Sequence, residues 1–162
     1  MFQKIKRIIP PEEVLEMIKL TPEMRKLKLD RDEIIKKIIS GEDDRMLFIV
    51  GPCSADNEDS VLDYVSRLAR LADEVKDKIF IVPRIYTNKP RTRGEGYKGM
   101  LHSPNPHTKV TDIQAGILSL RRMHARAISE SGLSAADEML YPDNVDYIQD
   151  LLSYIAVGAR ST

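Results

Sequence analysis

Residues 46–54 read MLFIVGPCS, an unbroken apolar run that ends in a glycine–proline turn. Runs of this length without polar alternation are typical of strands that are buried on both faces of a parallel sheet. A second run of the same kind, IFIV at 79–82, follows further along the chain. The repetition predicts that a parallel α/β sheet begins at the first run.

Amphipathic segments lie before and between these strands. Their periodicity predicts helices over residues 10–20, 21–41, 58–75, 111–131 and 141–154. The second helix has clear end signals, with Thr21 as N-cap, Pro22 as the first helical residue and Gly41 as the stop. Two more strands are predicted at 134–140 (SAADEML) and 154–160 (YIAVGAR).

Strands that alternate with helices form right-handed βαβ units around a parallel sheet. A doubly wound sheet and a (β/α)8 barrel both begin in this way, and a full barrel needs about 250 residues. The 162 residues end on the fourth predicted strand. We therefore expect an α/β chain that is the first half of something larger, and both architectures stay open at this point.

Composition excludes several classes of protein. Lys plus Arg and Asp plus Glu number 25 each, so the chain is neutral and is not expected to be a general nucleic-acid binder. No apolar run approaches the roughly 18 residues of a membrane span, and the N-terminus lacks a secretory signal pattern. A single cysteine excludes an intramolecular disulfide. These features favour a cytoplasmic protein without membrane partners.

Positive charge gathers in residues 84–101, RIYTNKPRTRGEGYKGML, directly after the second predicted strand. Five cations face one acid there, in a segment that fits neither the P-loop nor the dinucleotide-binding spacing. Two readings stay open, a solvated charged loop or a site for a small anion.

The carboxyl ends of parallel strands meet at one edge of a sheet, where α/β proteins bind ligands. Cys53, Arg84, Glu138 and Arg160 all fall at predicted strand ends. Together they suggest an anionic substrate and a metal ion, because guanidinium groups bind phosphate and carboxylate in a bidentate fork. The alternatives are a buried structural cysteine, surface arginines and a glutamate that only pairs with one of them. The histidines lie away from the strand ends and are expected to be exposed or packing residues: His102, His107 and His124.

Five motifs in order, IVGPCS, RIYTNKPRT, GYKGML, GLSAADEML and AVGAR, closely resemble 3-deoxy-D-arabino-heptulosonate-7-phosphate (DAHP) synthase of type I. The resemblance covers nearly the whole chain. It implies an N-terminal helical extension over residues 1–42, which serves oligomerisation or regulation, and the first half of a (β/α)8 TIM barrel over residues 43–162, truncated after strand four. It implies an enzyme that condenses phosphoenolpyruvate with erythrose 4-phosphate and water, releases phosphate, and begins the shikimate pathway. It also implies a divalent metal such as Mn²⁺ or Fe²⁺.

The resemblance assigns roles to residues of this chain. Arg84 and Lys89 match catalytic basic residues that hold phosphoenolpyruvate, and Arg160 matches the arginine that binds its phosphate. Arg91 and Thr92 match residues that meet the erythrose phosphate. Clustered cations would offset the repulsion between two phosphorylated substrates.

Two more residues are assigned by the same resemblance. Cys53 matches a metal-binding cysteine, and Glu138 falls in the motif of the third strand, where it would support the substrate site. The metal would polarise the aldehyde carbonyl for attack by the enol carbon.

The family's barrel continues for four more strands after the GAR motif, and the remaining metal ligands lie there. We therefore expect a fragment that is inactive alone, with a complementing C-terminal half as a possible partner and a homo-oligomer as the intact state. The alternatives are a non-catalytic half barrel that serves binding or assembly, and a sister enzyme that uses another phosphosugar.

Overall fold

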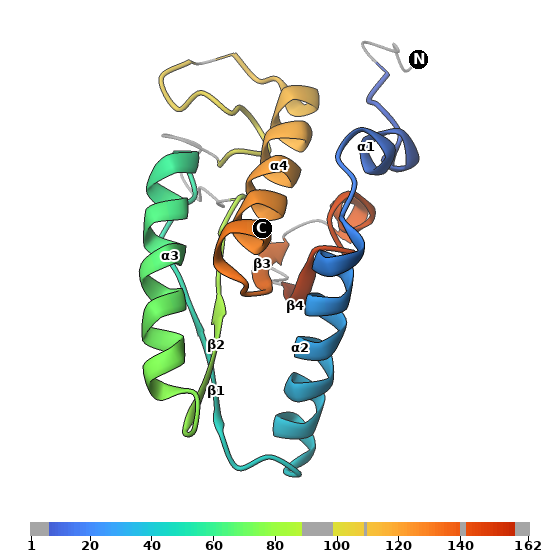
Figure 1. Ribbon diagram of the computed structural model, residues 1–162. Helices are drawn as coiled ribbons and strands as arrows, with labels where there is room; N and C mark the ends of the chain where they lie inside the picture. Colours follow the sequence, from blue (N-terminus) through green and yellow to red (C-terminus); the bar gives the residue numbers. More distant parts are fainter. Residues whose placement is uncertain (1–6, 89–98, 109, 140–141, 158–162) are drawn as a thin grey trace.

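The computed structural model describes residues 7–88, 99–108, 110–139 and 142–157 (Figure 1). Within these ranges the helices and strands follow in the order α1 (Pro11–Met17), α2 (Pro22–Ser40), β1 (Met46–Val50), α3 (Glu58–Val75), β2 (Ile79–Pro83), α4 (Ile113–Ser131), β3 (Ala135–Met139), the 3₁₀ helix η1 (Pro142–Tyr147) and β4 (Leu152–Val157). Parallel strands preceded by helices confirm the predicted α/β class. None of the helices in these ranges is both long and apolar enough to cross a bilayer.

The described strands all run parallel. β1 pairs with β2, and β3 pairs with β4. The two pairs are joined where Arg84, just after β2, bridges to Ala136 of β3, and Ile85 N donates to Ala136 O at 2.8 Å. The strands therefore lie side by side in chain order, as in part of an α/β barrel.

Alternate residues of β2 face two different layers. Ile81 packs with Leu68 of α3. Phe80 and Val82 pack with Ile35 of α2 on the other face. Helix α2 therefore covers the sheet face opposite α3, and Figure 1 shows β1 and β2 lying between these two helices.

Helix ends follow the signals in the sequence. Thr21 Oγ1 accepts a hydrogen bond from Met24 N at 3.3 Å, Pro22 is the first residue of α2, and Gly41 ends the helix with φ +79°. A left-handed residue is strained for any side chain, so glycine suits this position. Asn57 caps α3 in the same way as Thr21 caps α2.

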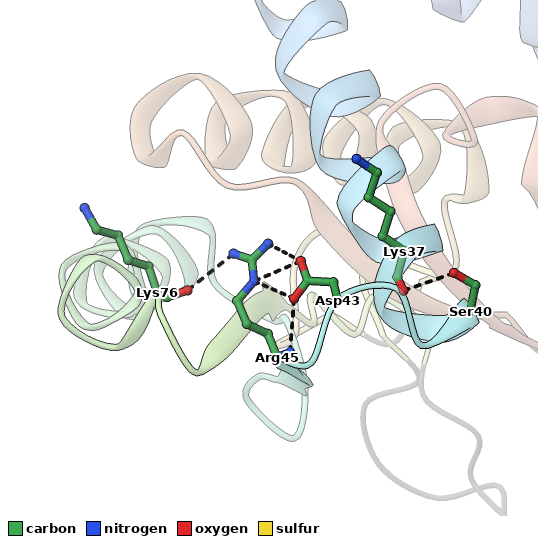
Figure 2. Close-up of polar contacts among 5 residues, drawn as sticks. All are labelled: Lys37, Ser40, Asp43, Arg45 and Lys76. Atoms are coloured by element: carbon green, nitrogen blue, oxygen red, sulfur yellow. Dashed lines mark hydrogen bonds and ion pairs between the residues drawn. The ribbon is translucent and has the colours of Figure 1, made fainter.

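The turn from α2 into β1 is held by a polar cluster (Figure 2). Arg45 donates hydrogen bonds to the Asp43 carboxylate through Nε and Nη2. It also donates through Nη1, at 3.3 Å, to Lys76 O in the turn between α3 and β2. Ser40 donates to Lys37 O at the end of α2. Met46 N donates to Lys78 O, so this cluster fixes the entry of β1 beside β2.

Two sequence predictions are wrong. β1 is not buried on both faces, because Met46 is 63% exposed and Phe48 46% exposed. This strand has a partner on one side only within the described residues, and an apolar run does not distinguish an outer strand from an inner one. The predicted helix at 141–154 is the short 3₁₀ helix η1, and β4 begins at Leu152, two residues earlier than predicted.

Candidate functional site

A hollow of about 400 Å³ opens at the carboxyl ends of the described strands. It is lined from each of these strands, or from the residue that follows, by Ile49, Val50, Gly51, Arg84, Ala136, Asp137, Glu138, Tyr154 and Ala156. The hollow lies on the α2 side of the sheet, beyond the apolar contacts of that helix. This position is where parallel α/β folds bind their ligands.

Arg84 and Glu138 meet at this hollow. Arg84 follows β2 directly, Glu138 lies in β3, and the Nη1 group of Arg84 donates to Oε1 of Glu138. Nη2 donates to Pro52 O at 3.1 Å, and the guanidinium lies 4.8 Å from the centre of the Tyr86 ring. The guanidinium is therefore held on three sides while its side chain stays 25% exposed to ligands.

The turn after β1 lies against the backbone of Arg84. A Cβ atom placed on Gly51 would lie 1.7 Å from Arg84 O, which no real side chain allows. Glycine at this position lets the GPCS turn approach and lets Pro52 O accept from Arg84. Close packing of the turn against the backbone of Arg84 thus explains the glycine of the GPCS motif.

Cys53 lies in the same turn and is exposed, so it is not a small buried core residue. It is one thiol donor, whereas a transition-metal site takes three or four protein ligands. Within the described residues no group of three or more His, Cys, Asp and Glu side chains is placed to hold a metal ion. The described part of the chain therefore does not make a metal site by itself.

The other predicted site residues lie outside the described residues: Lys89, Arg91, Thr92 and Arg160. Of the predicted set, the structure brings together Arg84 and Glu138, with the turn that carries Cys53 beside them. Glu138 pairs with Arg84, as one interpretation expected, and its role toward a substrate stays a prediction.

Sequence reasoning missed a buried carboxylate next to Glu138. Asp137 is 1% exposed and accepts hydrogen bonds from Thr87 N at 3.1 Å, from Thr87 Oγ1 and from Glu138 N at 2.7 Å. Two adjacent acids in a strand must point to opposite faces, so DE in SAADEML was a signal that one acid is buried under a helix. That helix is α4, which places the fully buried His124 beside Asp137.

Burial has opposite effects on these two groups. It raises the pKa of the Asp137 carboxyl to about 7, against the lowering effect of the hydrogen bonds from Thr87. It lowers the pKa of the His124 imidazole to about 4. Both directions follow from the cost of a charge in an interior that water does not reach. His124 is thus a packing residue as expected, while His107 is exposed.

Comparison with known proteins gives consistent results. The profile of the DAHP synthetase I family matches residues 18–162. The chain is 36% identical over 160 residues to the Phe-sensitive phospho-2-dehydro-3-deoxyheptonate aldolase of Escherichia coli strain K12, covering 99% of this chain and 45% of that protein. It is also 36% identical over 155 residues to the tyrosine-inhibited enzyme of that name from Candida albicans, covering 96% of this chain and 41% of the relative.

A solved structure extends the similarity to the fold. Phospho-2-dehydro-3-deoxyheptonate aldolase from Francisella tularensis SCHU S4 superposes with a TM-score of 0.90 at 29% identity, over 99% of this chain and 46% of that one. The chain therefore spans less than half the length of the relatives it matches. The family profile covers most of the chain and the fold matches that of a solved relative, so the chain belongs to the DAHP synthetase I family.

Proposed function

We propose that this chain supplies the phosphoenolpyruvate side of a DAHP synthase site. The reaction joins phosphoenolpyruvate, erythrose 4-phosphate and water to give DAHP and phosphate, the first step toward chorismate and the aromatic amino acids. The names of the relatives and the family support this reaction class. The relatives' greater length makes the whole activity a proposal for this chain.

The observation that carries the proposal is the Arg84–Glu138 pair at the hollow. A guanidinium has five N–H groups, and described residues accept from two of those on Arg84, one by Glu138 and one by Pro52. The other N–H groups of Arg84 have no acceptor among the described residues, and we propose that they bind a carboxylate or phosphate. Glu138 holds the guanidinium plane in place before a ligand binds, which lowers the entropic cost of binding.

The remaining substrate contacts are proposed from the family motifs. Lys89 would bind phosphoenolpyruvate beside Arg84, Arg160 would bind its phosphate, and Arg91 with Thr92 would bind the phosphate of the sugar. Bringing these cations to one mouth would offset the charge of two phosphorylated substrates. Holding both substrates there would also make their encounter effectively intramolecular.

Cys53 is proposed as one ligand of a divalent metal such as Mn²⁺ or Fe²⁺, which would act as a Lewis acid on the aldehyde when bound. An exposed thiol beside the Arg84 pair is a suitable donor, but it is one donor. Further ligands would have to come from outside the described residues, and we expect the chain alone to hold the metal weakly.

Exposed apolar side chains on the outermost described strands favour assembly with more protein. Met46 and Phe48 of β1 are exposed, as are Tyr154 and Val157 of β4. A complementing C-terminal half would cover these strands, and the intact enzyme is proposed to be a homo-oligomer with residues 1–42 contributing to assembly. An unpaired apolar edge otherwise favours self-association.

Calorimetric titration of the purified chain with phosphoenolpyruvate tests the proposal. We expect saturable binding with a Kd of about 1 mM or tighter, weakened by salt, and binding of pyruvate at least about tenfold weaker because pyruvate lacks the phosphate. Equal affinity for the two ligands, or no saturable binding of phosphoenolpyruvate, would refute it.

A further inference from the structure

Asp137 and His124 face each other behind the candidate site, on the side of β3 that α4 covers. Both side chains are fully buried, and His124 Nε2 lies 3.6 Å from Asp137 Oδ2. On the other side of the ring, Nδ1 lies 2.8 Å from Leu120 O. A carbonyl oxygen can only accept a hydrogen bond, so Nδ1 carries a hydrogen.

This geometry leaves Nε2 of a neutral imidazole as a bare acceptor opposite a carboxyl group. Nε2 has no hydrogen-bond partner within the described residues. Two acceptors facing each other in a dry interior repel, because the local dielectric is low. One proton between Nε2 and Oδ2 removes the repulsion, whichever of the two atoms carries it.

We propose that His124 and Asp137 form a couple that holds one proton at neutral pH, and that Asp137 acts through this couple as a positioning residue for the Arg84–Glu138 site. Its Oδ1 accepts from the backbone N–H groups of Thr87 and Glu138, and its Oδ2 from the Thr87 hydroxyl. One carboxyl thus ties the segment after β2 to β3. That segment runs from Arg84 to Asn88.

The direction of both pKa shifts agrees with this arrangement. Burial raises the pKa of Asp137 to about 7 and lowers the pKa of His124 to about 4, so the pair stays net neutral with one proton. Interacting groups at this distance titrate as a pair, so the shared proton belongs to the couple.

The charged groups around the couple are themselves paired. From β3, Glu138 raises the pKa of Asp137, and Arg84 of the segment after β2 neutralises Glu138. From α4, Arg121 lowers the pKa of His124, and Asp150, which precedes β4, neutralises Arg121. Other titratable groups on the packed elements include Tyr147 of η1, whose hydroxyl donates to Ile9 O, and Glu58 of α3, which pairs with Arg126.

The couple makes a specific prediction for stability against pH. Between about pH 4 and 6.5 the unfolded chain carries one proton on His124 and none on Asp137, and the folded couple also carries one. The couple therefore adds no pH dependence in this window. When one partner is removed, the shifted pKa of the other makes the free energy of unfolding depend on pH.

The two single variants have opposite signs. In His124→Leu, the raised folded pKa of Asp137 means that stability is present at low pH and is lost as pH rises from about 4 to 7. In Asp137→Asn, the lowered folded pKa of His124 means that stability is lost as pH falls from about 6.5 to 4. Each slope approaches a tenfold change in the unfolding constant per pH unit.

Urea unfolding of the whole chain between about pH 4.5 and 6.5 measures these slopes against the wild type. We expect opposite slopes for His124→Leu and Asp137→Asn and none for the double variant. The control His107→Leu removes an exposed histidine and should run parallel to the wild type. Single variants that both parallel the wild type, or that share one sign, would overturn the one-proton couple.

Amide hydrogen exchange tests the positioning role. The amides of Thr87 and Glu138 donate to Asp137, whereas the amide of Met46 donates to Lys78 O at the far end of the sheet. In Asp137→Ala we expect the first two to exchange at least about tenfold faster relative to Met46, and in Asp137→Asn to stay within about threefold, since asparagine keeps an acceptor. Equal acceleration of all three amides would mean that Asp137 only stabilises the fold, and it would overturn the positioning role.

Should the alanine variant fail to fold, Thr87→Val replaces it, because it removes one of the donors to Asp137. Faster exchange of the Glu138 amide relative to that of Met46 then supports the role, and unchanged exchange contradicts it. The catalytic meaning of this positioning rests on the proposed function. The slopes and exchange rates need no substrate, so a failure of phosphoenolpyruvate binding and a failure of the couple are distinguishable.

Discussion

Arg84 and Glu138 form an ion pair that joins the ends of β2 and β3 across the mouth of the hollow. Pro52 O, from the turn after β1, accepts a second hydrogen bond from the same guanidinium at 3.1 Å. One arginine thus gathers three neighbouring strand ends. Within the described residues, the Arg84–Glu138 pair is the centre of the candidate site.

Replacing Arg84 with lysine should weaken phosphoenolpyruvate binding by about tenfold or more. Lysine keeps the charge but cannot hold Glu138, Pro52 O and an anion with one planar fork. Calorimetric titration measures the change, with Arg126→Lys as the control, because Arg126 pairs with Glu58 and Glu130 on the helices. Equal losses in both variants would mean that general charge, rather than the Arg84 geometry, attracts the ligand.

Gly51→Ala should destabilise the fold by about 3 kcal/mol or more, because its Cβ would lie 1.7 Å from Arg84 O. Gly41→Ala is the matched control. It has open space around the new methyl group and only its positive φ to strain it, for a loss of about 1 to 2 kcal/mol. Urea unfolding compares the two, and equal losses would show that the turn after β1 can move away from Arg84.

Arg121→Met should cost about 3 kcal/mol of unfolding free energy. Arg121 is buried and donates to Ile18 O, to Tyr147 O and to the Asp150 carboxylate, so methionine leaves these acceptors without their donor. Arg126→Met should cost far less, because the Arg126 side chain on the same helix is 40% exposed. Thermal unfolding of both variants checks the difference, and a similar loss in each would contradict the role of Arg121 as the link between α4, the α1–α2 connection and η1.

Asp43→Asn should reduce stability at neutral pH but matter little in acid. Hydrogen bonds from Arg45 lower the pKa of Asp43 to about 2, so its contribution is present above about pH 4 and is lost as pH falls toward 2. Melting temperatures of wild type and variant should therefore differ at about pH 6 and converge only near pH 2. The exposed neighbour Asp44→Asn serves as the control. A difference that stays constant with pH would contradict the assignment.

Local signals in the sequence identified most of the elements. Thr21, Pro22 and Gly41 bound α2 as predicted, since capping depends on a few adjacent residues. The prediction placed β1 correctly but failed for its burial on both faces, and it failed for the segment before β4, because tertiary context decides both. Leu151 and Leu152 would also fit the apolar face of a helix. Both are buried, but Leu151 directly precedes β4 and Leu152 begins it. The parallel register also shifts between Ala135 and Ala136, so Ser153 is an extra residue that periodicity does not reveal.

The candidate site was predictable as far as strand ends could be counted. Arg84 and Glu138 were placed together because parallel strands align their carboxyl ends. Asp137 was overlooked because its partner His124 lies on a helix that precedes the strand, and the contact exists only after α4 packs on β3. Its role depends on burial, which a single sequence shows poorly.

Product formation from phosphoenolpyruvate and erythrose 4-phosphate in the presence of Mn²⁺ tests the central claim most directly. The chain would be assayed alone and together with the C-terminal half of the Escherichia coli relative, each with wild-type Arg84 and with Arg84→Lys. We predict no DAHP from the chain alone, DAHP from the combined halves, and a loss of that product with Arg84→Lys. DAHP formed by the chain alone, or product that is indifferent to Arg84, would contradict the account.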